Sequence, residues 1–470
     1  MNQSTVLIID GGGRGSVLVD KYSQSSHVIK ILAIPGNDLM LTNQKPVKIF
    51  PKIKTTDIKS IIKIAKDQKV DLVDVAQDDA VASGLVDALQ KEGINVFGPT
   101  KLAGQIEWDK AFARNFMRKF KITIPTFKIC HSQKEGINFI KKQKHAEWFI
   151  KASGLAAGKG ALHAQNNRQA IEKIRQMKDF GKAGQTYLIE KCLVGEEFSS
   201  FAIVDGKNFI IVGYAQDHKP VFDGDLGSNT GGMGCSSPPM AITPEVENQI
   251  ESIFKKTVEG LVKIGRPYQG ILYLGEMIDQ RSGLPAGRQV YAIEFNARWG
   301  DPEAQVIVPA IKNDFYELAN KVLNGQIKKI KIKKDNLYRV AVTAASRGYP
   351  SDYSKVIGKQ IFGLDQLLRN PVSSLRHPEP FACRSEQSEE SQDKLREGSI
   401  KVFGAGVKKK NNQYFVSGGR LFYVVAEGKN VAQARKIAYN ALSRVNVEGD
   451  NLHYRTDIGW RDLERFYERG

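Results

Sequence analysis

Residues 148–160 read WFIKASGLAAGKG, an apolar strand that ends at Lys151 and opens into a loop of glycines. Glycine lets the backbone approach a ligand closely, and the N–H groups of such loops bind phosphate oxygens. Lys151 and Lys159 add ammonium groups, and Gly158 and Gly160 flank the second of them. The spacing departs from the usual phosphate loop, because three residues rather than four separate the first two glycines and Gly160 replaces a Ser or Thr. The segment predicts a phosphate site, and a glycine hairpin with solvated lysines is the alternative.

A later strand, residues 290–295, carries a second group of polar residues. Glu294 and Asn296 are two positions apart, so their side chains share one face of the strand. Two protein oxygens beside nucleotide phosphates suit Mg²⁺, which keeps several waters and takes few protein ligands. Arg298 continues the same face and is placed to hold a carboxylate or acyl phosphate with two hydrogen bonds. The pattern predicts a metal and carboxylate site, and an exposed polar edge is the alternative.

Residues 216–234, QDHKPVFDGDLGSNTGGMG, form a loop rich in charge and glycine between apolar runs. Such a mixture is not needed in a core, and loops of this kind hold ligands against backbone amides. A mobile surface turn is the alternative.

The first 100 residues alternate strand and helix. The apolar run at 6–9 ends in Asp10-Gly11-Gly12-Gly13-Arg14, and the run at 28–34 ends in Pro35-Gly36-Asn37. Continuous apolar strands alternating with helices predict a doubly wound parallel sheet, with ligands at the carboxyl ends of its strands. A dinucleotide site is weakly indicated, because Ser16 stands where the last glycine of GxGxxG belongs.

The remaining segments predict an α/β and α+β chain of three domains. We expect an N-terminal α/β domain at 1–100, a two-lobed core at 101–330 and a small β-rich domain at 331–470. Two segments are interpreted as insertions, 281–289 and 371–399. The second has almost no apolar pattern and is expected to be disordered, because it buries too little surface to offset its ordering entropy.

Composition narrows the function classes. Of the 470 residues 41% are hydrophobic and 26% charged, which is typical of a soluble globular protein, and no apolar run approaches 20 residues. The four cysteines lie far apart without CxxC spacing, so they predict neither a zinc site nor a disulfide framework and suit a reducing compartment; we expect a cytoplasmic protein. The net charge of +18 indicates anionic substrates more than nucleic acid, because aromatic residues are not interleaved with the basic ones.

Together, the lysine strand, the glycine loop, two glutamates seven residues apart and the late Glu-x-Asn strand resemble an ATP-grasp site. The resemblance extends to the phosphoribosylamine–glycine ligase (GAR synthetase) family and covers nearly the whole chain except the two insertions. The segments that carry it are 98–100, 151–160, 216–219, 223–234, 294–303, 417–420 and 454–460.

The resemblance implies an enzyme that uses ATP and Mg²⁺ or Mn²⁺ to form glycyl phosphate. The amine of 5-phosphoribosylamine then attacks this intermediate, giving glycinamide ribonucleotide, ADP and phosphate. It implies small-molecule substrates, no nucleic acid or membrane partner, and a monomer or homodimer.

The resemblance also assigns residues to roles. The catalytic residues would be Arg298, Lys151 and Asp223. ATP would be held by Lys110, Lys151, Gly158, Lys159 and Gly160, with Glu190 at the adenine hinge and Glu197 on the ribose. Glycine and its acyl phosphate would be held by Lys219, Asp225, Asn229, Thr230, Gly231, Gly232, Arg298 and Asp301. Phosphoribosylamine would be held by Gly12, Gly13, Arg14, Pro35, Gly36 and Asn37, and the metal by Glu294 and Asn296.

Three N-terminal loops depart from the family pattern. Gly15-Ser16-Val17 stands where Glu-His-Ala is usual, Asp38-Leu39-Met40 replaces a run of small residues, and Ala76-Gln77-Asp78 replaces Gly-Pro-Glu. All three fall in the domain that the resemblance assigns to phosphoribosylamine. Two alternatives therefore stay open: an ATP-grasp ligase with a different amine acceptor, and a non-catalytic basic nucleic-acid-binding protein on this fold.

Overall fold

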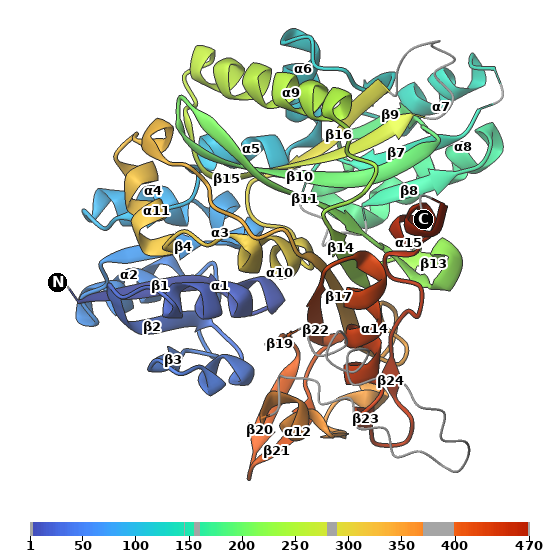
Figure 1. Ribbon diagram of the computed structural model, residues 1–470. Coiled ribbons are helices and arrows are strands. Elements are labelled where there is room, and N and C mark those ends of the chain that lie inside the picture. The colour runs from blue at the N-terminus through green and yellow to red at the C-terminus, as the bar shows by residue number, and fades with distance from the viewer. Residues whose placement is uncertain (1–2, 145, 155–159, 280–288, 370–398, 469–470) are drawn as a thin grey trace.

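The computed structural model describes residues 3–144, 146–154, 160–279, 289–369 and 399–468 (Figure 1). Gly158 and Lys159 of the glycine loop, and nearly all of both predicted insertions, lie outside the described residues. None of the described helices combines the length and the apolar character that crossing a bilayer requires.

The N-terminal segment forms the predicted parallel sheet. Its strand order is β3-β2-β1-β4-β5, and every pairing in it is parallel. The strands are β1 (Ser4–Asp10), β2 (Val28–Pro35), β3 (Val47–Ile49), β4 (Leu72–Val75) and β5 (Val96–Phe97), and the helices are α1 (Gly13–Ser23), α2 (Ile58–Asp67), α3 (Asp78–Ser83) and α4 (Leu85–Lys91). The two glycine-containing loops follow β1 and β2, which are neighbours, so they meet at one edge of the sheet.

A second, antiparallel sheet of four strands lies in the middle of the chain, in the order β6-β9-β7-β8. It consists of β6 (Phe127–Cys130), β7 (Trp148–Ala152), β8 (Ala161–Ala164) and β9 (Tyr187–Lys191). Around it lie α6 (Lys110–Lys119), α7 (Gln133–Lys141), α8 (Asn167–Gln176) and the 3-10 segment η2 (Met177–Gly184), whereas α5 (Lys101–Trp108) contacts α3, α6 and β16 (Gln289–Asn296). Lys151 stands on β7 and Glu190 on the neighbouring β9, so this sheet presents both residues.

The largest sheet has nine strands and joins the middle of the chain to its C-terminal part. Its main path runs β16-β15-β10-β11-β14-β17-β22-β19, and β24 pairs with β17. Its strands are β10 (Gly195–Gly206), β11 (Phe209–Asp217), β14 (Gly234–Ser237), β15 (Tyr268–Asp279), β16 (Gln289–Asn296), β17 (Tyr338–Ser346), β19 (Ile400–Gly404), β22 (Arg420–Gly428) and β24 (Leu452–His453). The short β14 pairs with β11 on one side and β17 on the other, so the β-rich C-terminal part is continuous with the core.

The other elements cover this sheet or extend from it. Figure 1 shows α9 (Pro244–Lys263) across one end and α14 (Val431–Leu442) against β17 and β22. The remaining helices are α10 (Glu303–Ile307), α11 (Phe315–Leu323), α12 (Leu364–Arg369) and α15 (Trp460–Glu468), with the 3-10 segments η1 (Asp38–Thr42), η3 (Asp223–Asp225), η4 (Val308–Ala310), η5 (Ile327–Lys329) and η6 (Ser354–Val356). Two small sheets contain β12 (Pro220–Phe222) with β13 (Leu226–Asn229), and β18 (Gln360–Phe362), β20 (Val407–Lys410), β21 (Gln413–Val416) and β23 (Asn446–Val447).

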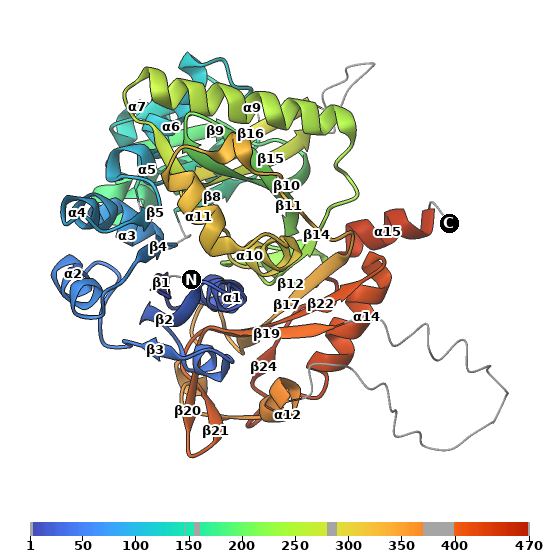
Figure 2. The same ribbon diagram turned by 60° about the vertical axis from the view of Figure 1, so that its left-hand side comes forward.

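One hydrophobic core connects the three parts. Val17 of α1, Phe315 of α11 and Tyr423 of β22 belong to the same cluster of buried side chains. Figure 2 shows α1 lying between α10 and β19, and α1 contacts both elements. The carboxyl edge of the N-terminal sheet is therefore held beside the end of β16, where Glu294 and Asn296 lie.

Candidate active site

Four cationic side chains surround the carboxylate of Glu294. Burial favours the neutral acid, but Lys219, Lys110, Lys151 and Arg298 outweigh it and lower the pKa of Glu294 below its ordinary value. The four come from separate elements: α6, β7, the loop after β11 and the loop after β16. The structure thus brings five predicted site residues together, and we call Lys110, Lys151, Lys219 and Arg298 the cationic cluster.

Glu294 and Asn296 have the environment of a hard-metal site. They lie two residues apart on β16, and the side chain of Glu294 packs over Gly275, where an added Cβ would stand 3.1 Å from Glu294 Cγ. Within the described residues, neither side chain is committed to a hydrogen bond. Carboxylate and amide oxygens left open beside a phosphate site are the donors that Mg²⁺ takes, so these residues fit the ion.

Lys151 is held by a buried acid. Its Nζ lies 2.5 Å from Glu190 Oε2, and Arg114 of α6 pairs with the other carboxylate oxygen. Burial opposes the charged form of Glu190, but the two cations lower its pKa to about 2. Arg114 was not predicted as a site residue from the sequence. A signal was available, because an arginine among the apolar positions of an amphipathic helix indicates a buried partner of opposite charge. It also donates to the carbonyl of Ile293 at 2.6 Å, which connects α6 to β16.

Lys219 contacts Glu197, although the sequence placed the two in different subsites. Burial disfavours the ammonium, but Glu197, Tyr273, Glu294 and Asp217 raise the pKa of Lys219 well above its usual value. Thr230 donates through both N and Oγ1 to the carbonyl of Lys219, each at 2.8 Å. This part of the glycine-rich segment therefore fixes the backbone from which Lys219 projects.

Arg298 has a partner that the sequence did not reveal. Its Nη2 lies 3.1 Å from Glu107 Oε1, and Glu107 Oε2 accepts the N–H of Ala297 at 2.7 Å. Burial raises the pKa of Glu107, and Arg298 opposes that rise. Arg298 Nε is buried without a hydrogen-bond partner among the described residues, so the guanidinium has a donor available for a ligand. Glu107 is a positioning residue for Arg298.

The loop after β1 is organised by Asp10. Its Oδ1 accepts the N–H groups of Gly12 at 2.5 Å and Gly15 at 3.1 Å, while Oδ2 accepts from Arg14 Nη2 at 2.7 Å. Arg14 also donates to the carbonyl of Trp299 at 2.9 Å and to Gln77, so most of its donors are occupied inside the protein. The main chain of this loop, rather than the Arg14 side chain, is what remains for a ligand.

The loop after β2 is also braced by its own side chain. The amide of Asn37 donates to the carbonyl of Gly11 at 3.0 Å, to Ser16 Oγ at 2.9 Å and to the carbonyl of Gly404 at 2.9 Å. Gly36 has a φ of +72°, and a Cβ there would stand 2.6 Å from Ile49 Cγ2, so this position requires glycine. Pro35 and Gly36 therefore form a fixed turn beside Gly11.

Asp301 joins this N-terminal loop to the rest of the site. A Cβ added at Gly12 would stand 3.1 Å from Asp301 Oδ2, so the loop and the carboxylate are neighbours. From β22, Arg420 lies 3.4 Å from Asp301 Oδ2 and donates to the carbonyls of Asp301 at 2.7 Å and Gly231 at 2.5 Å. Arg420, from the C-terminal part of the chain, thus connects Gly231 with Asp301.

Comparison with known proteins identifies the family. Three phosphoribosylglycinamide synthetase models match this chain: the N domain at residues 4–107, the ATP-grasp (A) domain at 108–304 and the C domain at 380–461. The phosphoribosylamine–glycine ligase of Caldanaerobacter subterraneus is 35% identical over 460 residues, which cover 96% of this chain and 99% of the relative. The chain belongs to the phosphoribosylglycinamide synthetase family.

Two further similarities agree with this. The trifunctional purine biosynthetic protein adenosine-3 of Bos taurus is 35% identical over 97% of this chain, which spans 42% of that longer protein. A crystal structure of phosphoribosylamine–glycine ligase from Thermotoga maritima superposes with a TM-score of 0.74 at 28% identity, covering 97% of this chain and all of the other. The cationic cluster and Glu294 fall within the ATP-grasp match of the synthetase family, and the Gly12 loop falls within the N-domain match.

For three residues that the sequence assigned to the synthetase site, the structure describes contacts with the C-terminal segment or exposure to solvent. Both carboxylate oxygens of Asp223 accept from Thr456, through its N–H at 2.8 Å and its hydroxyl. Asp225 pairs with Arg455 at 2.9 Å and Arg461 at 2.6 Å, and the neighbouring His218 together with these two arginines lowers the pKa of its carboxyl. Asn229 is exposed on β13. The geometry favours a role for Asp223 and Asp225 in holding the 454–460 motif against the core, rather than in chemistry.

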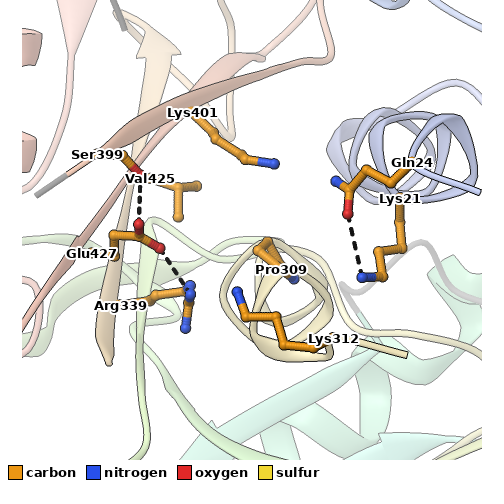
Figure 3. Close-up of a pocket in the computed structure, with 9 residues that line it drawn as sticks. All are labelled: Lys21, Gln24, Pro309, Lys312, Arg339, Ser399, Lys401, Val425 and Glu427. Atoms are coloured by element: carbon orange, nitrogen blue, oxygen red, sulfur yellow. Dashed lines mark hydrogen bonds and ion pairs between the residues drawn. The ribbon is translucent and has the colours of Figure 1, made fainter. Parts of the chain in front are cut away.

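The described cavity of about 300 Å³ lies apart from this synthetase site (Figure 3). It opens between α1, η4 and strands β17, β19 and β22, and shares no residue with the cationic cluster. Burial, with help from Lys312 and Lys401, lowers the pKa of Lys21 in this cavity to about 8. Arg339 there is paired with Asp335 and with Glu427 at 2.8 Å. The cavity is a polar junction between the three parts of the chain.

Proposed function

We propose that this protein joins glycine to 5-phosphoribosylamine at the expense of ATP, forming glycinamide ribonucleotide, ADP and phosphate in purine biosynthesis. The observation that carries the proposal is the cationic cluster around Glu294, placed beside the contact between Gly12 and Asp301, in a chain of the synthetase family. The protein would act in the cytoplasm as a monomer or homodimer.

The chemistry requires activation of glycine, because a carboxylate is a poor electrophile. ATP transfers its γ-phosphoryl group to a carboxylate oxygen of glycine, and ADP leaves. Lys110, Lys151 and Lys219 offset negative charge on the transferring group, and Arg298 orients the glycine carboxylate. Bound at Glu294 and Asn296, Mg²⁺ or Mn²⁺ would neutralise charge on the nucleotide phosphates. The amine of phosphoribosylamine then attacks the acyl carbon, and inorganic phosphate leaves.

Recognition of phosphoribosylamine would rest on main-chain groups. The N–H groups at the start of α1 face the loop after β1, and a helix N-terminus attracts phosphate. Ser16 does not replace the missing carboxylate and imidazole of the family, because its hydroxyl donates to the carbonyl of Gly404 at 2.7 Å and accepts from Asn37. We therefore expect a raised apparent KM for the amine, with the principal contacts made by those main-chain groups of residues 11–14 that Asp10 does not already bind.

The nucleotide would lie between the four-stranded sheet and β16. Lys151 would reach the phosphates from β7, and Glu190 on the neighbouring β9 would border the adenine. The family resemblance assigns Gly158, Lys159 and Gly160 to the phosphates as well. Glu197 would accept hydrogen bonds from the ribose hydroxyls. Lys219 would then leave Glu197 and turn towards the acyl phosphate.

The proposal is tested by following ADP release and glycinamide ribonucleotide with purified protein, ATP and Mg²⁺. ADP release that requires both glycine and phosphoribosylamine, with product in equal amount, is the expected result. No product with phosphoribosylamine, alongside rapid product with another amine, would overturn the assignment of the acceptor. ADP release independent of glycine would overturn the assignment of the electrophile.

A further inference from the structure

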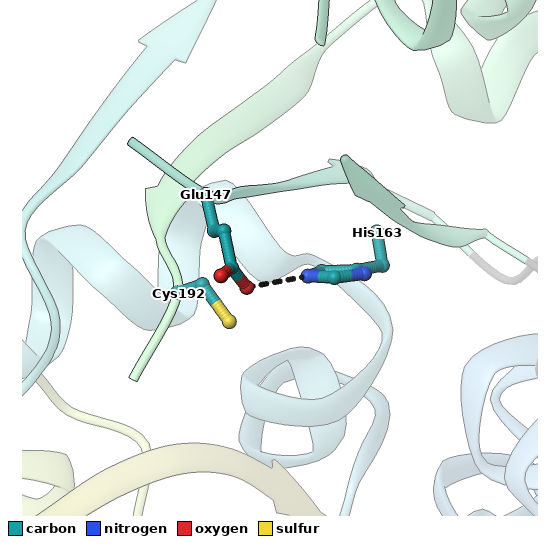
Figure 4. A group of neighbouring side chains, drawn as sticks. All are labelled: Glu147, His163 and Cys192. Carbon is teal, nitrogen blue, oxygen red and sulfur yellow. Dashed lines mark hydrogen bonds and ion pairs between the residues drawn. The ribbon is translucent and has the colours of Figure 1, made fainter. Parts of the chain in front are cut away.

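A group of metal-binding side chains lies on the four-stranded sheet, outside the residues used above. Glu147 precedes β7, His163 stands on β8 and Cys192 follows β9. The potential ligand atoms of these three side chains all lie within 4.8 Å of one another (Figure 4). Strand pairing fixes this arrangement, because the N–H of Cys192 donates to the carbonyl of Glu147 at 3.0 Å and Phe149 pairs with His163.

The donor types indicate a particular class of ion. A thiolate, an imidazole nitrogen and a carboxylate oxygen are ligands of Zn²⁺, whereas Mg²⁺ and Ca²⁺ take oxygen alone. Three protein ligands leave a fourth tetrahedral position for water. We propose that Glu147, His163 and Cys192 bind one Zn²⁺ ion. On binding, the Cys192 thiol proton passes to solvent and a Zn–S bond forms, so affinity rises with pH.

The spacing of the three groups is close to what the ion needs. Zn–ligand bonds of about 2.0–2.3 Å place ligand atoms of a tetrahedral site roughly 3.3–3.8 Å apart. His163 Nε2 already lies 3.2 Å from Glu147 Oε2, and both side chains are exposed enough to change rotamer. The thiol of Cys192 donates to the carbonyl of Leu193 at 3.4 Å. On Zn²⁺ binding it would leave this carbonyl and move towards Glu147 and His163.

The site adjoins the face of the sheet that presents Lys151. Side chains alternate along a strand, so Glu147, Phe149 and Lys151 share a face. The rings of Phe149 and His163 pack 5.1 Å apart, and Lys151 Nζ lies 5.4 Å from the Phe149 ring. Zn²⁺ binding is therefore expected to change the affinity for ATP, and ATP binding the affinity for Zn²⁺. This coupling rests on the proposed function, whereas the metal site does not.

Binding is measured by titrating the full-length protein with Zn²⁺ against a chromogenic chelator, and by the thiolate-to-metal absorption band of Co²⁺ in its place. The expected result is one equivalent for the wild type, with affinity reduced by about tenfold or more in Cys192→Ala and in His163→Ala. Cys130→Ala and His131→Gln are matched controls, because Cys130 is buried with its thiol pKa raised to about 11 and His131 lies outside the group.

A second readout does not depend on any variant. Zn²⁺ should slow alkylation of Cys192, located by mass spectrometry, without slowing that of other cysteines. Wild-type protein without one equivalent of bound Zn²⁺, or Cys192→Ala binding as tightly as wild type, would overturn the site. An affinity for free Zn²⁺ that saturating ATP leaves unchanged would overturn the coupling alone. Absence of glycine-dependent ADP release from Zn²⁺-free protein supplied with ATP and Mg²⁺ would instead count against the proposed function.

Discussion

Replacing Glu107 by Gln tests whether Glu107 holds the side chain of Arg298 in position. Glu107 lies on α5, pairs with Arg298 at 3.1 Å and accepts the N–H of Ala297 at 2.7 Å. Glutamine has nearly the same shape and keeps an oxygen for Ala297, but its NH₂ group faces the guanidinium. The variant therefore removes the ion pair between Glu107 and Arg298 and leaves the backbone contact in place.

The size of the effect follows from that ion pair. If its loss costs as much as that of a hydrogen bond to a charged group, about 1.5–3 kcal/mol, kcat/KM for glycine falls roughly tenfold to 150-fold. The affinity for ATP should change little, because Glu107 does not contact Lys151 or Glu190. Asp78 and Glu303 also raise the pKa of Arg298, so its charge keeps other partners and the fold should survive the change.

The assay is ADP release at saturating ATP and phosphoribosylamine with varied glycine. Arg298→Lys and the double variant complete a double-mutant cycle, and Glu317→Gln is the matched control because its exposed side chain pairs only with His27 among the described residues. We expect Glu107→Gln to cost much less in the Arg298→Lys background than in the wild type. An equal loss in both backgrounds, or unchanged kcat/KM in the single variant, would refute the positioning role.

Four other outcomes follow from the structure. Lys151→Met should raise the apparent KM for ATP about tenfold or more with little change for glycine, measured by ADP release; unchanged ATP kinetics would place Lys151 outside the site. Glu294→Gln should raise the Mg²⁺ concentration needed for half-maximal turnover, and a wild-type Mg²⁺ profile would contradict its role as a ligand. Burial raises the pKa of Asp74 in the folded protein to about 7, from its ordinary value of 3.8. The charged carboxylate therefore destabilises the folded protein fully above pH 7, and this destabilisation is lost as the pH falls towards 3.8. Asp74→Asn should therefore raise the free energy of unfolding at pH 8 by about 4 kcal/mol, and by much less at pH 5, in denaturant titrations; an equal effect at both pH values would disprove the shift. Asp223→Asn should lower Tm by weakening the contact with Thr456 while kcat falls less than about tenfold; a larger loss of kcat without a change in Tm would restore a catalytic role.

Local patterns in the sequence predicted several structural features correctly. Continuous apolar runs that alternate with helices predicted parallel strands at β1, β2, β4 and β5, because strands buried on both faces need apolar residues at every position; the short edge strand β3 was not predicted. Glu294 and Asn296 share a face because side chains alternate along any strand. The glycine and lysine loop indicated the ATP-grasp core, and the family match confirms that resemblance.

The tertiary structure decided which charged groups meet. Glu107 and Arg298 are 191 residues apart, and Asp223 and Thr456 are 233 apart, so nothing in local spacing distinguishes a ligand-binding carboxylate from one that holds a distant segment. The sequence accordingly grouped Asp223 and Asp225 with the glycine site, whereas both contact residues 455–461. The three ligands of the proposed Zn²⁺ site are likewise neighbours only because β8, β7 and β9 pair side by side. Strand pairing and domain packing bring together residues that are far apart in the sequence. They therefore decide which charged side chains meet, and local periodicity does not.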